Sequence, residues 1–120
     1  MRDNNRADKI IMRKIIEYCE KTEVLIQRFG ATFDKFSSDA AFQLSCSMCI
    51  VQIGELMIRL SDDFKSQHSE IPWRAIKAMR NVLVHDYEDI NWASAWDDLT
   101  KGIPELKTQL EQILAAEETT

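Results

Sequence analysis

The chain has 120 residues, 45% of them hydrophobic and 29% charged, and a formal net charge of −5. This length suits one domain with a single hydrophobic core, and the composition is ordinary for a globular protein. The acidic balance argues against binding of nucleic acid through a broad basic face, so any RNA contact has to be local or the partner is something else.

Three features predict a cytoplasmic protein that does not enter a membrane. The three cysteines lack the spacing of a disulfide framework, which fits a reducing compartment. The charged start, Met1 to Arg6, is not followed by the apolar core of a secretory signal. We also find no run that approaches the roughly 20 apolar residues of a membrane span.

The small number of turn-forming residues, three glycines and two prolines, predicts an all-α fold. The first helix is expected to end at about Phe29, where Gly30 supplies a left-handed stop. Residues 32–38 are predicted to form a connection in which Phe33 and Phe36 tuck under the bundle.

The segment from about Asp39 to Phe64 is the longest and most apolar predicted helix. Its apolar residues recur at spacings of three and four and form a wide stripe: Phe42, Cys46, Cys49, Ile50, Ile53, Leu56, Met57, Leu60 and Phe64. A stripe this wide predicts contacts on two sides, with the chain's own core and with a second subunit. Cys46 and Cys49 have the spacing of a redox or zinc pair, but no second pair accompanies them, which favours a packing role. Gly54 costs a helix about 1 kcal/mol relative to alanine, so we expect another backbone to approach closely there.

The polar stretch from Asp62 to Ile71 is expected to be a frayed helix end and a loop. Pro72 suits the first turn of a third helix, because its missing N–H would be unpaired there anyway. That helix should end near His85, since the residues that follow are acidic and typical of a turn.

The last apolar run is interrupted by Gly102 and Pro104, which predicts two roughly coaxial helices over residues 92–101 and 104–115. A tail from about residue 116 is predicted to be disordered. The whole chain is therefore expected to be a single domain, a four- to five-helix antiparallel bundle that forms a homodimer.

The stretch of residues 80–87 combines side chains that can cleave RNA without a metal or a cofactor. Histidine titrates near neutrality, so His85 can take the proton of a 2′-hydroxyl or give one to the leaving 5′-oxygen. The planar guanidinium of Arg80 can bind phosphate bidentately and stabilise a phosphorane. Asn81 can donate to a phosphate or to the ribose. Two such motifs in a dimer would supply one histidine for each proton transfer and leave a 2′,3′-cyclic phosphate.

Helical geometry restricts how Arg80 and His85 can cooperate. Five positions turn a helix through about 500°, so the two side chains point roughly 140° apart. They converge only if the helix ends or bends between them, or if two copies meet across a dimer interface. A simpler interpretation, which the spacing alone favours, is that both cations only offset the helix macrodipole. Glu55 likewise has two interpretations: it pairs with Arg59 at i,i+4, which the spacing favours, or it orients Arg80 or His85 from the neighbouring helix.

Several motifs together resemble the HepT-like branch of the HEPN superfamily. In chain order they are Ile53-Gly54-Glu55, Ile71-Pro72-Trp73, Arg80-Asn81 with His85-Asp86-Tyr87, Trp96, and Ile103-Pro104. The resemblance spans about residues 6–115, and Arg-Asn-x-x-x-His-x-Tyr behind Ile-Pro-Trp is a specific pattern. It implies an all-helical homodimer and a metal-independent endoribonuclease, the toxin of a toxin–antitoxin pair, with its cleft where two motifs meet.

Carried over position by position, the resemblance implies catalytic roles for Arg80 and His85 and a supporting role for Asn81. It also implies that Tyr87 is the tyrosine to which the antitoxin, a cognate MntA-like minimal nucleotidyltransferase, adds AMP. The added charge and bulk beside the histidine would repel RNA phosphates. Asp86 is a mild departure from the pattern. It places an acidic side chain beside His85, where it can compete with the substrate phosphate.

Because the chain is acidic, RNA binding is expected to rely on Arg80 together with Arg74 and Lys77, and to be strongly salt-dependent. An alternative of a different class is a non-catalytic HEPN module that binds a nucleotide or a nucleotidyltransferase through the same cleft. A third is a helical dimerisation module without a site.

Overall fold

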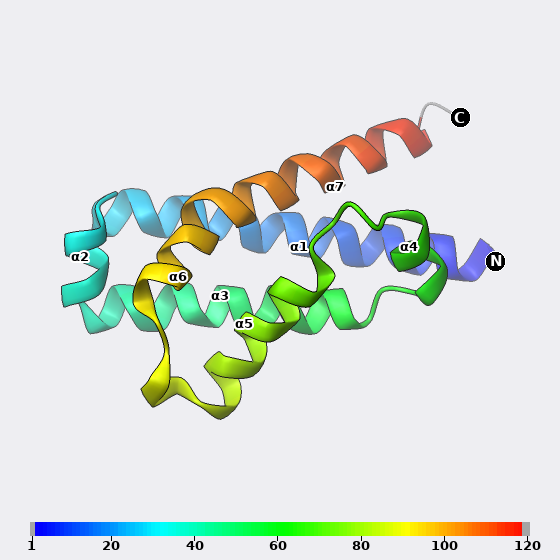
Figure 1. The fold of residues 1–120 in the computed structure, drawn as a ribbon. Helices are drawn as coiled ribbons and strands as arrows, with labels where there is room; N and C mark the ends of the chain where they lie inside the picture. The colour runs from blue at the N-terminus through cyan, green and yellow to red at the C-terminus, as the bar shows by residue number, and fades with distance from the viewer. Residues whose placement is uncertain (1, 119–120) are drawn as a thin grey trace.

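The computed structural model describes residues 2–118, and the side chains of residues 5–117 (Figure 1). Over this range the chain is helical and contains no strand, which confirms the predicted all-α class. The elements are α1 (Arg2–Phe29), α2 (Phe33–Ser38), α3 (Ala40–Ile58), α4 (Asp62–Gln67), α5 (Trp73–His85), the 3₁₀ turn η1 (Tyr87–Asp89), α6 (Trp92–Asp97), the π-helical segment η2 (Asp98–Gly102) and α7 (Ile103–Glu118).

The long helices form the frame of the molecule. α1 and α3 run antiparallel and side by side, α7 lies along α1, and α5 crosses α3 obliquely (Figure 1). The start of α1 and the end of α7 therefore lie at the same end of the molecule, together with α4. This arrangement leaves one side of α3 covered by α1 and another side crossed by α5, which carries the 80–87 motif.

The core lies between α1, α3 and α7 and is closed at one end by α2 and α6. Gly30 adopts a φ of 115° and ends α1, as the sequence predicted. The largest fully buried side chains come from these helices, from η2 and from the segment before α5: Met12, Ile15, Phe36, Phe42, Ile53, Ile71, Leu99, Leu106 and Leu110. The predicted stripe of the second helix supplies much of this core, since Phe42, Cys46, Ile50 and Ile53 are all buried.

α3 ends at Ile58 and not at Phe64, where the sequence placed the end of the second helix. The reason is a contact with a distant part of the chain. The buried carboxylate of Asp8 accepts hydrogen bonds from the Ser61 backbone N–H at 2.9 Å and from its hydroxyl at 2.6 Å. The Ser61 hydroxyl in turn accepts from the Phe64 N–H at 3.1 Å and caps α4, so a new helix begins where a frayed end was predicted.

Replacement of Asp8 by alanine is expected to destabilise the protein. It leaves the half-buried Ser61 donors without their carboxylate, and such a loss costs about 1–3 kcal/mol. Urea unfolding followed by circular dichroism measures the change. The control is Glu17→Ala, which removes an exposed carboxylate from the same helix and should leave the free energy of unfolding nearly unchanged. Equal stability of the two variants would contradict the role given to Asp8.

α2 takes the place of the connection predicted over residues 32–38. Thr32 caps it by accepting a hydrogen bond from the Lys35 N–H at 3.2 Å. Phe36 is fully buried as predicted, but the prediction for Phe33 is wrong, because its side chain is 38% exposed. Phe33 is the first residue of this short helix, whereas the ring of Phe36, three residues later, packs against rings of α3 and α6.

Gly102 and Pro104 do not break the last helical run. The chain continues from α6 through η2 into α7. In the π-helical turn the Ile103 N–H bonds back to the Asp98 carbonyl, five residues earlier. The next N–H in line is the one that Pro104 lacks, so the wider turn accommodates the proline. α7 extends to Glu118, past the predicted start of a disordered tail at about residue 116, and residues 119–120 lie outside the described range.

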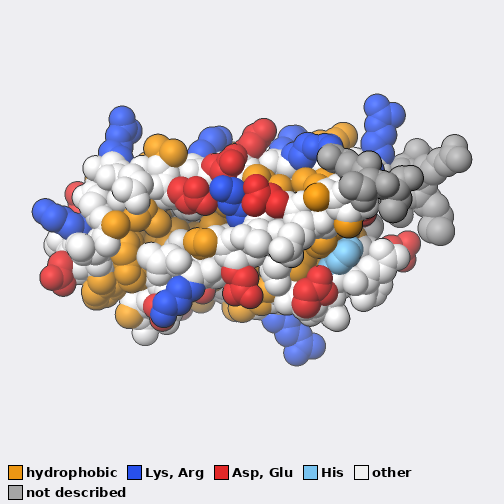
Figure 2. Space-filling model, turned by 90° about the horizontal axis from the view of Figure 1, so that it is seen from above, with side chains coloured by type: hydrophobic (Ala, Val, Ile, Leu, Met, Phe, Trp, Pro, Cys, Tyr) orange, Lys and Arg blue, Asp and Glu red, His pale blue; other side chains and the backbone are white. Residues whose placement is uncertain are grey.

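α3 also corrects the expectation that no segment has the length and composition of a membrane span. Its 19 residues are long and apolar enough by those two criteria alone, and half of the window that meets them is buried inside the protein. A core helix of a globular protein meets the same criteria. On the face seen from above α7, acidic and basic side chains alternate without gathering into a broad basic patch (Figure 2).

Candidate functional site

The closest approach of two helices at the candidate site is between Gly54 of α3 and Arg80 of α5. A Cβ placed on Gly54 would lie 2.6 Å from the Cβ of Arg80 and 2.7 Å from its Cγ. A residue with a side chain at position 54 would therefore displace α5 or the Arg80 side chain. Gly54 does mark a close approach, as predicted, but the group that approaches is the Arg80 side chain and not another backbone.

The Arg80 side chain is held by two neighbours. Its Nε donates to Glu55 Oε1 at 2.5 Å, Nη2 forms an ion pair with the same oxygen, and Nη1 donates to Asn81 Oδ1 at 2.8 Å. Glu55 therefore orients Arg80, and the pairing with Arg59 that the spacing favoured is wrong. A guanidinium has five N–H donors, so these contacts fix its direction and leave two donors for a ligand. The Arg80 side chain is 20% exposed, which keeps it accessible.

His85 is the last residue of α5, as predicted, and its side chain is exposed. Within the described chain no hydrogen bond or ion pair joins His85 to Arg80. α5 is helical through both residues, so their side chains point roughly 140° apart. A helix end or bend between them, one of the two routes to convergence, does not occur.

Tyr87 begins the 3₁₀ turn η1 that follows α5. Its half-buried ring meets the Trp92 ring edge to face, with centroids 5.5 Å apart, and no hydrogen bond within the described residues holds its hydroxyl. Asp86 lies between Tyr87 and His85 and is exposed. A hydrogen bond with Asp89, together with the charge of Asp89, raises the pKa of the Asp86 carboxyl, so Asp86 is engaged by a second acid and not by the histidine.

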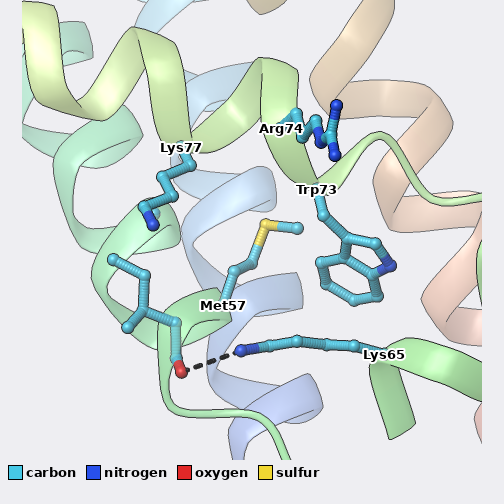
Figure 3. Close-up of a pocket in the computed structure, with 7 residues that line it drawn as sticks. Met57, Lys65, Trp73, Arg74 and Lys77 are labelled. Carbon is cyan, nitrogen blue, oxygen red and sulfur yellow. Dashed lines mark hydrogen bonds between the residues drawn. The ribbon is translucent and has the colours of Figure 1, made fainter. Parts of the chain in front are cut away.

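Arg74 and Lys77 lie exposed on α5, before Arg80, and border a pocket of about 230 Å³ between α3, α4 and α5 (Figure 3). Gly54, Met57, Ile58, Lys65 and Trp73 line the rest of it. The sequence did not reveal Lys65 as a neighbour of the other two cations, because its segment was expected to be a loop. The signal available in the sequence was Ser61, which can cap a helix that contains Lys65.

A stripe of exposed apolar residues runs along the uncovered side of α3. Leu44, Met48 and Ile58 are 58%, 58% and 42% exposed. With Val51 and Glu55 they recur at spacings of three and four, so all five share one face of the helix. The carboxylate that holds Arg80 therefore lies within an apolar surface.

Cys46 and Cys49 are free and buried, as is Cys19. Burial raises the pKa of the Cys46 and Cys19 thiols to about 12, so they stay protonated and pack as small apolar groups. The packing role predicted for Cys46 and Cys49 is confirmed.

Comparison with known proteins gives a consistent result. The model of the family described as "Ribonuclease HepT-like" matches residues 15–113. A protein of Caldanaerobacter subterraneus subsp. tengcongensis named "Putative RNase TTE0752" is 34% identical over 107 residues, which cover 88% of this chain and 93% of that protein. A "Probable ribonuclease HepT" of Thermococcus cleftensis is 31% identical over 108 residues, 90% of this chain and 96% of that protein. No solved structure matches.

Proposed function

The chain belongs to the HepT-like ribonuclease family, and from this premise we propose that it is the toxin of a toxin–antitoxin pair, an endoribonuclease that needs no metal. The observation that carries the proposal is the Arg80 guanidinium, which Glu55 and Asn81 hold in one direction while two of its donors stay available. A preorganised cation of this kind lowers the energy of a phosphorane more than that of a bound phosphate, because charge builds up on the phosphorus oxygens as the new bond forms.

The proposed reaction is an attack of the RNA on its own phosphate. His85 takes the proton of a 2′-hydroxyl, and the 2′-oxygen forms a bond to phosphorus. Arg80 binds the non-bridging oxygens of the phosphorane. The His85 of a second copy gives a proton to the 5′-oxygen as its bond to phosphorus breaks. The products are a 2′,3′-cyclic phosphate and a 5′-hydroxyl, and the two histidines exchange protonation states.

Two copies are required because one helix cannot aim both side chains at one phosphate. With the helical geometry above, only a meeting of two α5 helices lets Arg80 and His85 converge. The apolar stripe of Leu44, Met48 and Ile58 supports such a dimer, since an exposed surface of this kind next to Glu55 is a suitable interface. Burial of this stripe in a two-fold interface would bring both copies of the 80–87 motif to one cleft.

The direct test is cleavage of RNA in the presence of EDTA. Purified wild-type protein is expected to cut total RNA and leave 2′,3′-cyclic phosphate ends, whereas Arg80→Ala and His85→Ala proteins should be at least about 100-fold slower, since each loses a proton-transfer or charge-stabilising group. Absence of cleavage by pure, unmodified wild-type protein would refute the nuclease and leave the non-catalytic binding module as the alternative.

Tyr87 is proposed as the site at which an MntA-like nucleotidyltransferase silences the toxin. Its phenolic oxygen would attack the α-phosphorus of ATP and release pyrophosphate, leaving AMP two residues from His85. Co-expression with such an enzyme is expected to add the mass of AMP and to abolish RNA cleavage, because the phosphate repels RNA from the cleft. Tyr87→Phe should stay unmodified and active, and Tyr18→Phe serves as the matched control. An equal mass gain in the Tyr87→Phe protein would place the modification elsewhere.

A further inference from the structure

The pocket between α3, α4 and α5 adjoins the site without being part of the 80–87 motif. Gly54 lines the pocket and also contacts Arg80, so the two are direct neighbours. Along α5, Lys77 lies one turn before Arg80 and Arg74 lies two turns before it, which places their backbones about 4.5 and 9 Å along the helix axis from that of Arg80.

Three cations surround the pocket, and no ion pair within residues 5–117 neutralises any of them. Arg74 and Lys77 are exposed on α5, and Lys65 reaches across from α4 (Figure 3). The Lys65 ammonium donates one hydrogen bond, to the Ile58 carbonyl at 3.1 Å, and retains two further donors. The chain as a whole has a net charge of −5, so a local cluster of three cations without acidic partners favours an anionic ligand at this pocket.

The interior of the pocket is apolar and aromatic. Met57 is buried and lies between Lys77 and the Trp73 ring (Figure 3). Trp73 is fixed in place, because its Nε1 donates to the His68 carbonyl at 3.0 Å and its ring meets the Phe64 ring edge to face. The benzene side of the indole is turned toward Met57, so an aromatic ring and a flexible thioether line the pocket next to each other.

We propose that this pocket binds one nucleobase of single-stranded RNA, next to the phosphate that Arg80 holds, with Lys65, Arg74 and Lys77 on the backbone phosphates; this rests on the proposed function. The combination of an aromatic wall with cations at the rim is the one that binds single-stranded nucleic acid. A volume of about 230 Å³ is below the range of about 300–1,000 Å³ that holds a drug-sized ligand, so it admits a base while the ribose and phosphate stay at the rim.

The experiment is a scan of RNA with one base removed at a time. A single-stranded oligoribonucleotide of about ten residues, with an abasic unit at each position in turn, is titrated into His85→Ala protein in EDTA, and the same set into His85→Ala/Trp73→Leu protein. Removal of one particular base is expected to weaken binding about tenfold in the first protein, a typical loss for one stacked base, and to have little effect in the second. Circular dichroism establishes that both proteins are folded.

A second variant tests the rim and does not depend on Trp73. Lys65→Gln/Arg74→Gln is expected to weaken binding and to reduce the slope of log K against log salt by about 0.7 for each phosphate that the variant no longer neutralises. The matched control is Lys14→Gln/Arg28→Gln, which removes two exposed cations from α1 and should leave the slope unchanged.

The two proposals fail in different ways. If wild-type protein cuts RNA but no abasic position weakens binding, or if the loss persists in full with Trp73→Leu, the pocket does not bind a base. If the scan shows a position coupled to Trp73 but wild-type protein does not cut RNA, the pocket binds a base and the nuclease is refuted.

Discussion

Dilution of wild-type chains with Arg80→Ala/His85→Ala chains is expected to lower RNA cleavage as the square of the wild-type fraction. Both groups lie on one helix and point roughly 140° apart, so a complete site needs two α5 helices. A mixed dimer then lacks one full motif and is inactive. At equal amounts and constant total protein, activity should fall to about a quarter of the wild-type value, whereas independent sites would retain about a half.

The measurement requires complete exchange of subunits, which incubation before the assay provides and mass spectrometry of tagged chains verifies. Dilution with active Lys14→Gln chains is the control and should leave cleavage unchanged, because Lys14 is exposed on α1, away from the motif. A linear fall with the double variant would show that each chain carries a complete site. Sedimentation as a monomer at micromolar concentration would contradict the shared cleft independently.

The sequence predicted the parts of the site that depend on local pattern. The end of α5 at His85 follows from the acidic turn behind it, and the close approach at Gly54 follows from the cost of glycine inside a helix. The partner of Glu55 was not predictable from spacing. Arg59 lies one turn away in sequence, but α5 crosses α3 at Gly54 and brings Arg80 to the carboxylate. A pairing across helices depends on the crossing geometry, which i,i+4 spacing does not contain.

The same distinction explains the differences in the fold. Gly30 ends α1 where the local pattern placed the stop. The apolar stripe continues to Phe64, so it does not predict the break after Ile58. The break depends on Asp8, near the start of α1 and 53 residues before Ser61 in the sequence. Once Ser61 is recruited by that carboxylate, α4 begins, and Lys65 is brought to the pocket beside Arg80. The contact between Asp8 and Ser61 thus determines where α4 begins and, with it, the position of Lys65 at the pocket.

Gly54→Ala is expected to lower both activity and stability. The new methyl group would lie 2.6 Å from the Cβ of Arg80, a contact with the root of the side chain and not with a flexible end. Either α5 moves outward or the arginine leaves Glu55. A displacement of about 1 Å at a catalytic group costs about 100-fold in rate, and overpacking costs about 1–3 kcal/mol of folding free energy. This loss would occur although alanine by itself favours a helix by about 1 kcal/mol.

Gly102→Ala is the matched control for this substitution. A Cβ at Gly102 would come no closer than 3.7 Å to its nearest neighbour, Asp98 Oδ1, which is an ordinary van der Waals distance. The same chemical change in another helical segment should therefore leave RNA cleavage unchanged and not reduce stability. Cleavage rates in EDTA and urea unfolding of both variants separate the two effects. If Gly54→Ala keeps full activity and stability, the approach of α5 to α3 does not hold Arg80 in place, and Glu55 alone must orient the guanidinium.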